Sequence, residues 1–217
     1  MVDVKKDRRQ TVAEEVANSI SHGIGALLAV VGTVVLISTA LSRRSTIDLM
    51  SSILYGSSMI LLYLMSTLYH AVTARNVKEL FRTFDHCSIF ILILGSYIPI
   101  CLSLLGGWVG WTLLIFNTTL AVLGIVLNAI DVQKWHKWSL LLYVFMGWSI
   151  VVAAVPLFHL VPTPGLLLLV GGGLSYSIGI VFYRAHQLRY MHTIWHLLVL
   201  GGSALHYFFM LFYVFVS

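Results

Sequence analysis

Residues 191–216 read MHTIWHLLVLGGSALHYFFMLFYVFV and form the last apolar segment of the chain. The segment is long enough to cross a bilayer as one helix, which needs about 20 mostly apolar residues. Near its start, His192 and His196 are four residues apart, so on a helix they lie on one face, about one turn apart, and can bind the same ion. The pair can equally be two hydrogen-bonded packing residues, so its meaning depends on the rest of the chain.

The composition predicts an integral membrane protein. Hydrophobic residues make up 59% of the chain and charged residues 10%, with a mean hydropathy of +0.94, which leaves almost no sequence for a soluble core. Seven apolar runs can cross a bilayer as helices, approximately 22–41, 49–71, 85–105, 109–129, 138–158, 164–183 and 193–216. The connections are short and contain no linker. We therefore expect an all-α, seven-transmembrane helix bundle that forms one domain over residues 1–217, with residues 1–21 as a polar segment leading into the first helix.

Several other kinds of protein and site are excluded. The net charge is +5, but the basic residues form short clusters between apolar runs, so we predict no nucleic-acid partner. Cys87 and Cys101 are 14 residues apart, about 21 Å on a helix and too far for a disulfide. His206 lies about 15 Å beyond His196 on the same helix, and His159 falls near the opposite end of its span, so neither can join the histidine pair.

The distribution of Lys and Arg predicts the orientation of the helices. With a cytoplasmic N-terminus, the inside segments hold 11 of the 13 basic residues: Lys5, Lys6, Arg8, Arg9, Arg75, Lys78, Arg82, Lys134, Lys137, Arg184 and Arg189. Only Arg43 and Arg44 fall outside. Because cytoplasmic connections carry the excess of basic residues, we expect the N-terminus inside and, after seven crossings, the C-terminus outside. The protein would then be a multi-pass protein of the cell (plasma or inner) membrane.

This orientation brings further polar residues to the depth of the histidine pair. The second expected span ends on the cytoplasmic side with Ser66 and His70, and the third begins there with Asp85. The seventh begins on the same side with His192 and His196. Taken alone, Asp85 is equally consistent with a simple helix N-cap. Three neutral imidazoles at one depth, however, suit zinc and leave a fourth position open for water, as in catalytic sites. Residues at the same level on one face of the first helix are Glu15, Asn18 and His22.

The polar residues together resemble the three signature motifs of the hemolysin III and progestin/adipoQ (adiponectin) receptor family. The motifs are Glu15-x-x-Asn18-x-x-Ser21-His22, Ser66-x-x-x-His70 with Asp85, and His192-x-x-x-His196. The resemblance covers essentially the whole chain and points to the short bacterial branch. It implies a seven-helix bundle with a cytoplasmic N-terminus and Zn2+ held by His70, His192 and His196. It further implies that Asp85 contacts the zinc-bound water and that Ser66 supplies a neighbouring hydroxyl. Eukaryotic members resemble receptors with ceramidase-like activity, whereas bacterial members are described as hemolysins.

Two functions of different classes remain open. In the first, the protein is a zinc-dependent hydrolase in which Asp85 orients or deprotonates a water molecule that attacks a lipid amide or ester, with Ser66 supporting the water or the oxyanion. In the second, the zinc is structural, and the protein is a receptor, a membrane regulator or a pore-forming cytolysin. The expected partners are membrane lipids, one of which is the substrate in the first case.

Overall fold

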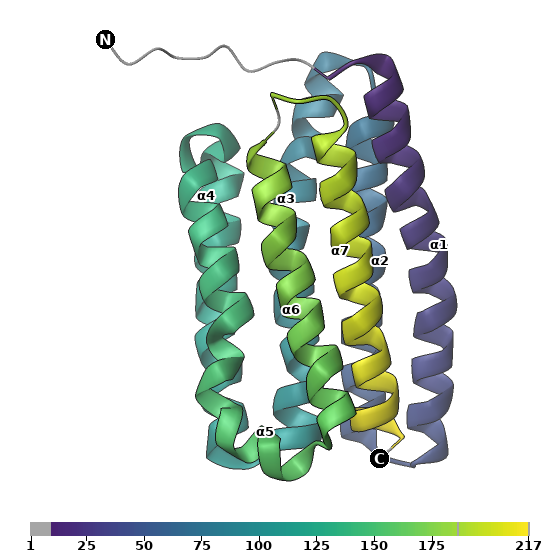
Figure 1. Cartoon of the computed structure of the whole chain (residues 1–217), viewed down its shortest axis with the longest axis vertical. Coiled ribbons are helices and arrows are strands. Elements are labelled where there is room, and N and C mark those ends of the chain that lie inside the picture. The colour runs from purple at the N-terminus through teal and green to yellow at the C-terminus, as the bar shows by residue number, and fades with distance from the viewer. Residues whose placement is uncertain (1–9, 186, 217) are drawn as a thin grey trace.

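The computed structural model describes residues 10–185 and 187–216, and these residues form helices and no strand (Figure 1). The elements are α1 (Val12–Ser42), α2 (Thr46–Ala71), α3 (Arg75–Pro99), η1 (Ile100–Leu105), α4 (Gly107–Trp148), η2 (Ser149–Ala153), α5 (Ala154–Leu160), α6 (Thr163–Arg184), α7 (Met191–Met210) and η3 (Leu211–Phe215). The long helices run side by side along one axis, and α1 and α7 both begin at the upper end in Figure 1. Four residues of the predicted basic count, Lys5, Lys6, Arg8 and Arg9, lie outside the described residues.

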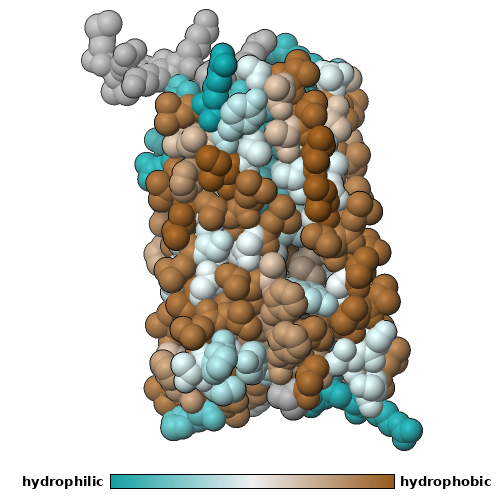
Figure 2. Space-filling model, turned by 45° about the vertical axis from the view of Figure 1, so that its right-hand side comes forward, coloured by the Kyte–Doolittle hydropathy of each residue, from teal (hydrophilic) through white to brown (hydrophobic). Residues whose placement is uncertain are grey.

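The surface of the bundle is that of a membrane protein. Within the described part of the chain, six helical segments are long and apolar enough to cross a membrane. Large apolar side chains are exposed along these segments, such as Leu27 at 72% and Phe158 at 71%. Figure 2 shows a broad apolar belt between two hydrophilic ends. Soluble proteins seldom expose a continuous apolar surface of this extent, so the predicted all-helical, multi-pass membrane class is confirmed.

Helix α4 contains a reversal of the chain. Asp131 has extended backbone angles (φ −163°, ψ 98°) inside the assigned helix, and its Oδ1 accepts hydrogen bonds from the next turn, from the N–H groups of Gln133 and Lys134 at 2.9 Å each. Asn117 Nδ2 lies only 2.9 Å from Ser149 Oγ, whereas 32 residues of straight helix would separate them by about 48 Å. The arms 107–130 and 132–160 therefore run antiparallel, as Figure 1 shows.

Two helices begin about ten residues earlier than the apolar runs predict. Helix α1 starts at Val12 rather than near residue 22, because Thr11 and Glu14 form a capping box that satisfies the free N–H groups of the first turn. Helix α3 starts at Arg75 rather than at residue 85. Hydropathy marks the lipid-facing part of a helix and misses such polar extensions. Asp85 consequently lies about three turns inside α3, and its interpretation as an N-cap is wrong.

Small residues allow the helices around the predicted site to approach closely. A Cβ atom added at Gly25 in α1 would lie 2.6 Å from a Leu200 side-chain carbon in α7 and 3.0 Å from the Tyr63 ring in α2. A larger residue at this position would require the Leu200 side chain or the Tyr63 ring to shift. On the other side of α7, the Ser175 hydroxyl of α6 donates to the Leu198 carbonyl at 2.7 Å. Such small-residue contacts are typical of helix packing in membranes, and they fix α7 between α1 and α6.

Candidate metal centre

Three histidines converge at the end of the bundle where α2 ends and α7 begins. The ligand atoms of His70, His192 and His196 all lie within 4.8 Å of one another. The Nε2 atoms of His70 and His192 are 3.3 Å apart. His70 and His196 are buried, with 4% and 0% of their surface exposed. The structure thus brings together the three residues that the sequence suggests as metal ligands.

Glu15 orients His70 and determines which of its nitrogens carries the proton. His70 Nδ1 lies 2.7 Å from Glu15 Oε2, and because a carboxylate accepts hydrogen bonds, Nδ1–H is the donor. The other oxygen of Glu15 pairs with Lys78 Nζ at 3.1 Å, and Lys78 also donates to the Tyr69 carbonyl at 3.0 Å. These contacts tie α1, α2 and the start of α3 together. They leave the Nε2 lone pair of His70 directed at the other histidines.

Asn18 and Ser21 orient His196 and determine that its Nδ1 carries the proton. The Nδ1 atom of His196 lies 3.2 Å from the Asn18 carbonyl oxygen and 3.1 Å from Ser21 Oγ. Ser21 donates its own proton to the Asn18 carbonyl at 2.8 Å, so His196 Nδ1–H is the donor to both. The Nε2 atom of His196 is buried and has no hydrogen-bond partner within the described part of the chain. A buried lone pair without a partner is rare, and a metal ion would satisfy it.

The residue types of the donor set suit a tetrahedral metal ion, and one of the three pairs has the matching separation. Nitrogen ligands at 2.0–2.1 Å from a tetrahedral zinc are about 3.3 Å from each other, and the His70–His192 pair already has this separation. Imidazoles that bind a metal through one nitrogen usually donate the other N–H to an oxygen, as His70 and His196 do. In residues 10–185 and 187–216 no second cluster of this kind is present. His206 instead contacts the Leu169 carbonyl at 3.0 Å, as expected from its distance along α7.

Asp85 and Ser66 are both buried near this cluster. Asp85 is 2% exposed and Ser66 is 0% exposed. The Ser66 hydroxyl lies close enough to interact with the Asp85 carboxyl, although its geometry falls short of a hydrogen bond. The Asp85 carboxyl is 3.8 Å from His86 Nδ1, also too far for one. Asp85 and His192 both border one cavity that extends along the bundle.

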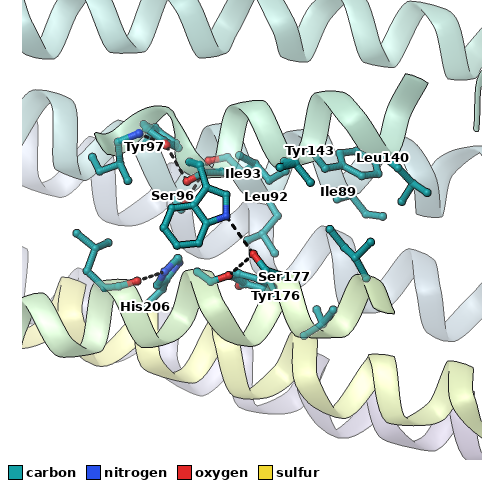
Figure 3. Close-up of a pocket in the computed structure, with 18 of the residues that line it drawn as sticks. Ile89, Leu92, Ile93, Ser96, Tyr97, Leu140, Tyr143, Tyr176, Ser177 and His206 are labelled. Carbon is teal, nitrogen blue, oxygen red and sulfur yellow. Dashed lines mark hydrogen bonds between the residues drawn. The ribbon is translucent and has the colours of Figure 1, made fainter. Parts of the chain in front are cut away.

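The cavity has a volume of about 250 Å³ and runs between α3, the second arm of α4, α6 and α7. Its lining is predominantly apolar and aromatic. Figure 3 shows its middle part, with Ser96 and Tyr97 on one side and Ser177 and His206 on the other. The Trp148 indole N–H donates to Ser177 Oγ at 3.0 Å and links α4 to α6. An apolar cavity with a few polar groups is the usual form of a site for an amphiphilic ligand.

Three residues that sequence patterns did not indicate join α3, α4 and α6 next to this site. The Tyr183 hydroxyl lies 3.5 Å from His86 Nε2 and 3.4 Å from His136 Nδ1. The position of His86 in α3 follows from its place directly after Asp85. Tyr183 belongs to an apolar run in which no pattern distinguishes it. His136, in the second arm of α4, also lines the cavity.

Comparison with known proteins agrees with the motifs. Residues 10–207 match the family described as Haemolysin-III related. The chain is 44% identical to Hemolysin-3 of Bacillus cereus over 94% of both chains, and 42% identical to the Hemolysin-3 homolog of Bacillus subtilis (strain 168) over 94% of this chain and 95% of the relative. It is also 29% identical to the human monocyte to macrophage differentiation factor over 92% of this chain and 84% of the relative. The chain is therefore a member of the haemolysin-III-related family.

Proposed function

We propose that this protein is a zinc-dependent hydrolase that cleaves the amide or ester bond of a lipid inside the membrane. The observation that carries the proposal is the convergence of three imidazoles on one point beside an apolar cavity that Asp85 and His192 both border. Three histidines with a free fourth position are the ligand set of several catalytic zinc sites. The cavity suits the hydrocarbon chain of an amphiphile better than a soluble substrate.

His70, His192 and His196 would hold the zinc ion. When bound there, zinc would polarise the carbonyl group and make water more acidic. Asp85 orients the attacking water and accepts its proton, and the Ser66 hydroxyl donates to the water or to the carbonyl oxygen. A bond forms between the water oxygen and the carbonyl carbon, and the C–N or C–O bond breaks. The proton passes to the departing amine or alcohol, and the products are a fatty acid and that amine or alcohol.

A structural role for the zinc is the alternative. In that case the ion only ties α2 to α7, and the protein acts as a receptor, a membrane regulator or a cytolysin. The name of the Bacillus cereus relative, Hemolysin-3, favours a cytolysin. A conducting pore needs polar groups along its whole length, whereas the cavity lining here is dominated by residues such as Ile89, Leu92 and Val199. We therefore favour the hydrolase.

The activity is tested by metal removal and restoration. The purified protein in lipid nanodiscs is given a panel of lipid amides and esters, and the release of fatty acid is measured by mass spectrometry. We expect release from at least one lipid, its loss after treatment with a chelator, and its return when one equivalent of zinc is added. A protein with a full complement of zinc that releases no fatty acid from any member of the panel would contradict the hydrolase and favour the structural role.

The proposed topology has seven crossings, with the two arms of α4 as the fourth and fifth. The excess of basic residues in the expected inside segments supports a cytoplasmic position for the N-terminus and the metal centre. We expect reporter fusions or protease protection to locate positions near 43, 107 and 161, and the C-terminus, outside the cytoplasm. Fusions near residues 75 and 134 serve as internal controls and should report a cytoplasmic position. A cytoplasmic C-terminus would refute this orientation and the leaflet assigned to the site.

A further inference from the structure

Buried polar atoms without a hydrogen-bond partner gather around the metal centre. Seven such side-chain atoms occur in the described part of the chain, and five of them belong to His22, Tyr63, Ser66 and His196. Native structures seldom leave such atoms unsatisfied, and each one calls for a ligand, an ion or a water molecule. The metal accounts for His196, and the proposed reaction accounts for Ser66. The Tyr63 hydroxyl also lacks a partner, but His22 is the residue of this group in which two side-chain atoms lack one.

His22 is held firmly although neither of its nitrogens is bonded. It is 1% exposed, and its ring stacks on His196 with 3.6 Å between ring centroids and 6° between planes. The Tyr63 ring packs edge-on against it at 5.1 Å. The backbone of His196 approaches His22, but without the geometry of a hydrogen bond, so both Nδ1 and Nε2 remain without a partner. Packing therefore fixes the ring, and the choice of an imidazole over an apolar ring is left unexplained by packing.

His22 also borders the cavity that reaches Asp85 and His192. It does not belong to the group whose ligand atoms lie within 4.8 Å of one another, so it is not a fourth metal ligand in this arrangement. A neutral imidazole offers one donor and one acceptor. In an apolar cavity a small number of such groups fixes the position of a ligand.

We propose that His22 hydrogen-bonds the carboxyl-derived polar group of the lipid in this cavity, the acid, amide or ester, next to the metal centre. The identity of the ligand rests on the proposed hydrolase function, whereas the demand for a polar partner rests on the burial of His22 alone. His22 then acts in binding: it holds the polar group beside the metal ligands while the hydrocarbon chain extends along α3 and α6. It takes no part in proton transfer.

His22→Phe separates this role from packing. Phenylalanine keeps a planar ring that can stack on His196 and removes both nitrogens. We expect the zinc content to stay at the parental value and the thermal stability without lipid to be equal or higher, because an unsatisfied polar group is removed from the interior. Oleate, used as the probe, should bind about tenfold more weakly, the effect of one hydrogen bond to a charged or polar group. His22→Asn, which keeps a donor and an acceptor, should recover part of the affinity.

Asn128→Leu is the matched control. Asn128 is also buried, at 1% exposure, but its Oδ1 accepts a hydrogen bond from Ser139 at 2.6 Å, and it does not line the cavity. This change should lower thermal stability and leave oleate affinity unaltered. Affinity is measured by displacement of a fluorescent fatty acid from zinc-loaded protein, so the result does not depend on turnover.

The inference is overturned by any of four results: no oleate binding to the parent, parental oleate affinity in folded His22→Phe, loss of zinc in that variant, or a loss of stability as large as that of Asn128→Leu. The last result would show that His22 is satisfied by an internal water. If oleate binding depends on His22 while no lipid is hydrolysed, the hydrolase proposal fails and the role of His22 as a binding residue stands.

Discussion

Replacing His70, His192 or His196 with alanine is expected to abolish stoichiometric zinc binding and to destabilise the bundle. In the proposed zinc site each residue would supply one of three protein ligands, and because the ion would join α2 to α7, the free energy of binding would add to the stability of the folded state. With free zinc at 100 times its Kd, the parent gains about 2.7 kcal/mol, or about 5 to 10 °C in Tm for a chain of this length. The alanine variants should lose this gain. Metal content by mass spectrometry and melting curves with and without chelator measure both effects.

A graded variant tests whether the surrounding contacts act as the geometry suggests. Glu15→Gln keeps the size of the side chain but replaces the carboxylate that accepts the His70 Nδ1–H at 2.7 Å. We expect zinc affinity to fall by about 10- to 100-fold, as for other residues that orient a metal-binding histidine. His159→Ala, at the opposite end of the bundle, is the control and should retain parental zinc affinity. Full zinc occupancy in all three alanine variants of the ligand histidines would refute the metal centre.

The convergence of the three histidines was predictable from the sequence because two simple regularities locate them. The spacing of His192 and His196 places both on one helix face, and the alternation of helix direction through the membrane puts His70 at the same level. Neither regularity depends on how the helices pack sideways. The polar turns at the start of α3 were not predicted, since apolar runs show where lipid surrounds a helix and say nothing about the turns that precede it.

The contacts around the ligands and the cavity could not be predicted in the same way. The Glu15–His70 bond and the stacking of His22 on His196 require α1 to lie between α2 and α7 at a particular rotation. That rotation depends on close contacts such as those at Gly25. The cavity is lined by residues of several helices, and no spacing within any one helix marks them. Its position beside Asp85 became visible only in three dimensions.

Asp85→Asn is expected to leave zinc content and fold intact while turnover of a lipid amide or ester falls by about 10² to 10⁴-fold, the usual contribution of a general base. Asparagine has nearly the size of aspartate but cannot accept a proton from water. The Asp85 carboxyl is 2% exposed and lies 3.8 Å from His86 Nδ1. A buried carboxylate without a close ion pair is costly, so the neutral amide should leave stability unchanged or raise it.

The comparison of parent and Asp85→Asn distinguishes catalysis from structure, which the histidine variants cannot do because they alter metal, stability and activity together. Zinc stoichiometry, Tm and fatty-acid release are measured side by side, with Ser66→Ala as a second variant that keeps the carboxyl. A rise in Tm together with a loss of turnover would mean that the protein keeps a destabilising buried charge for its chemistry. Unchanged turnover would remove Asp85 from the mechanism, and loss of zinc would make its carboxylate a metal ligand. If zinc is lost in Asp85→Asn, the fourth position of the site would be filled by the protein, which is the arrangement of a structural zinc.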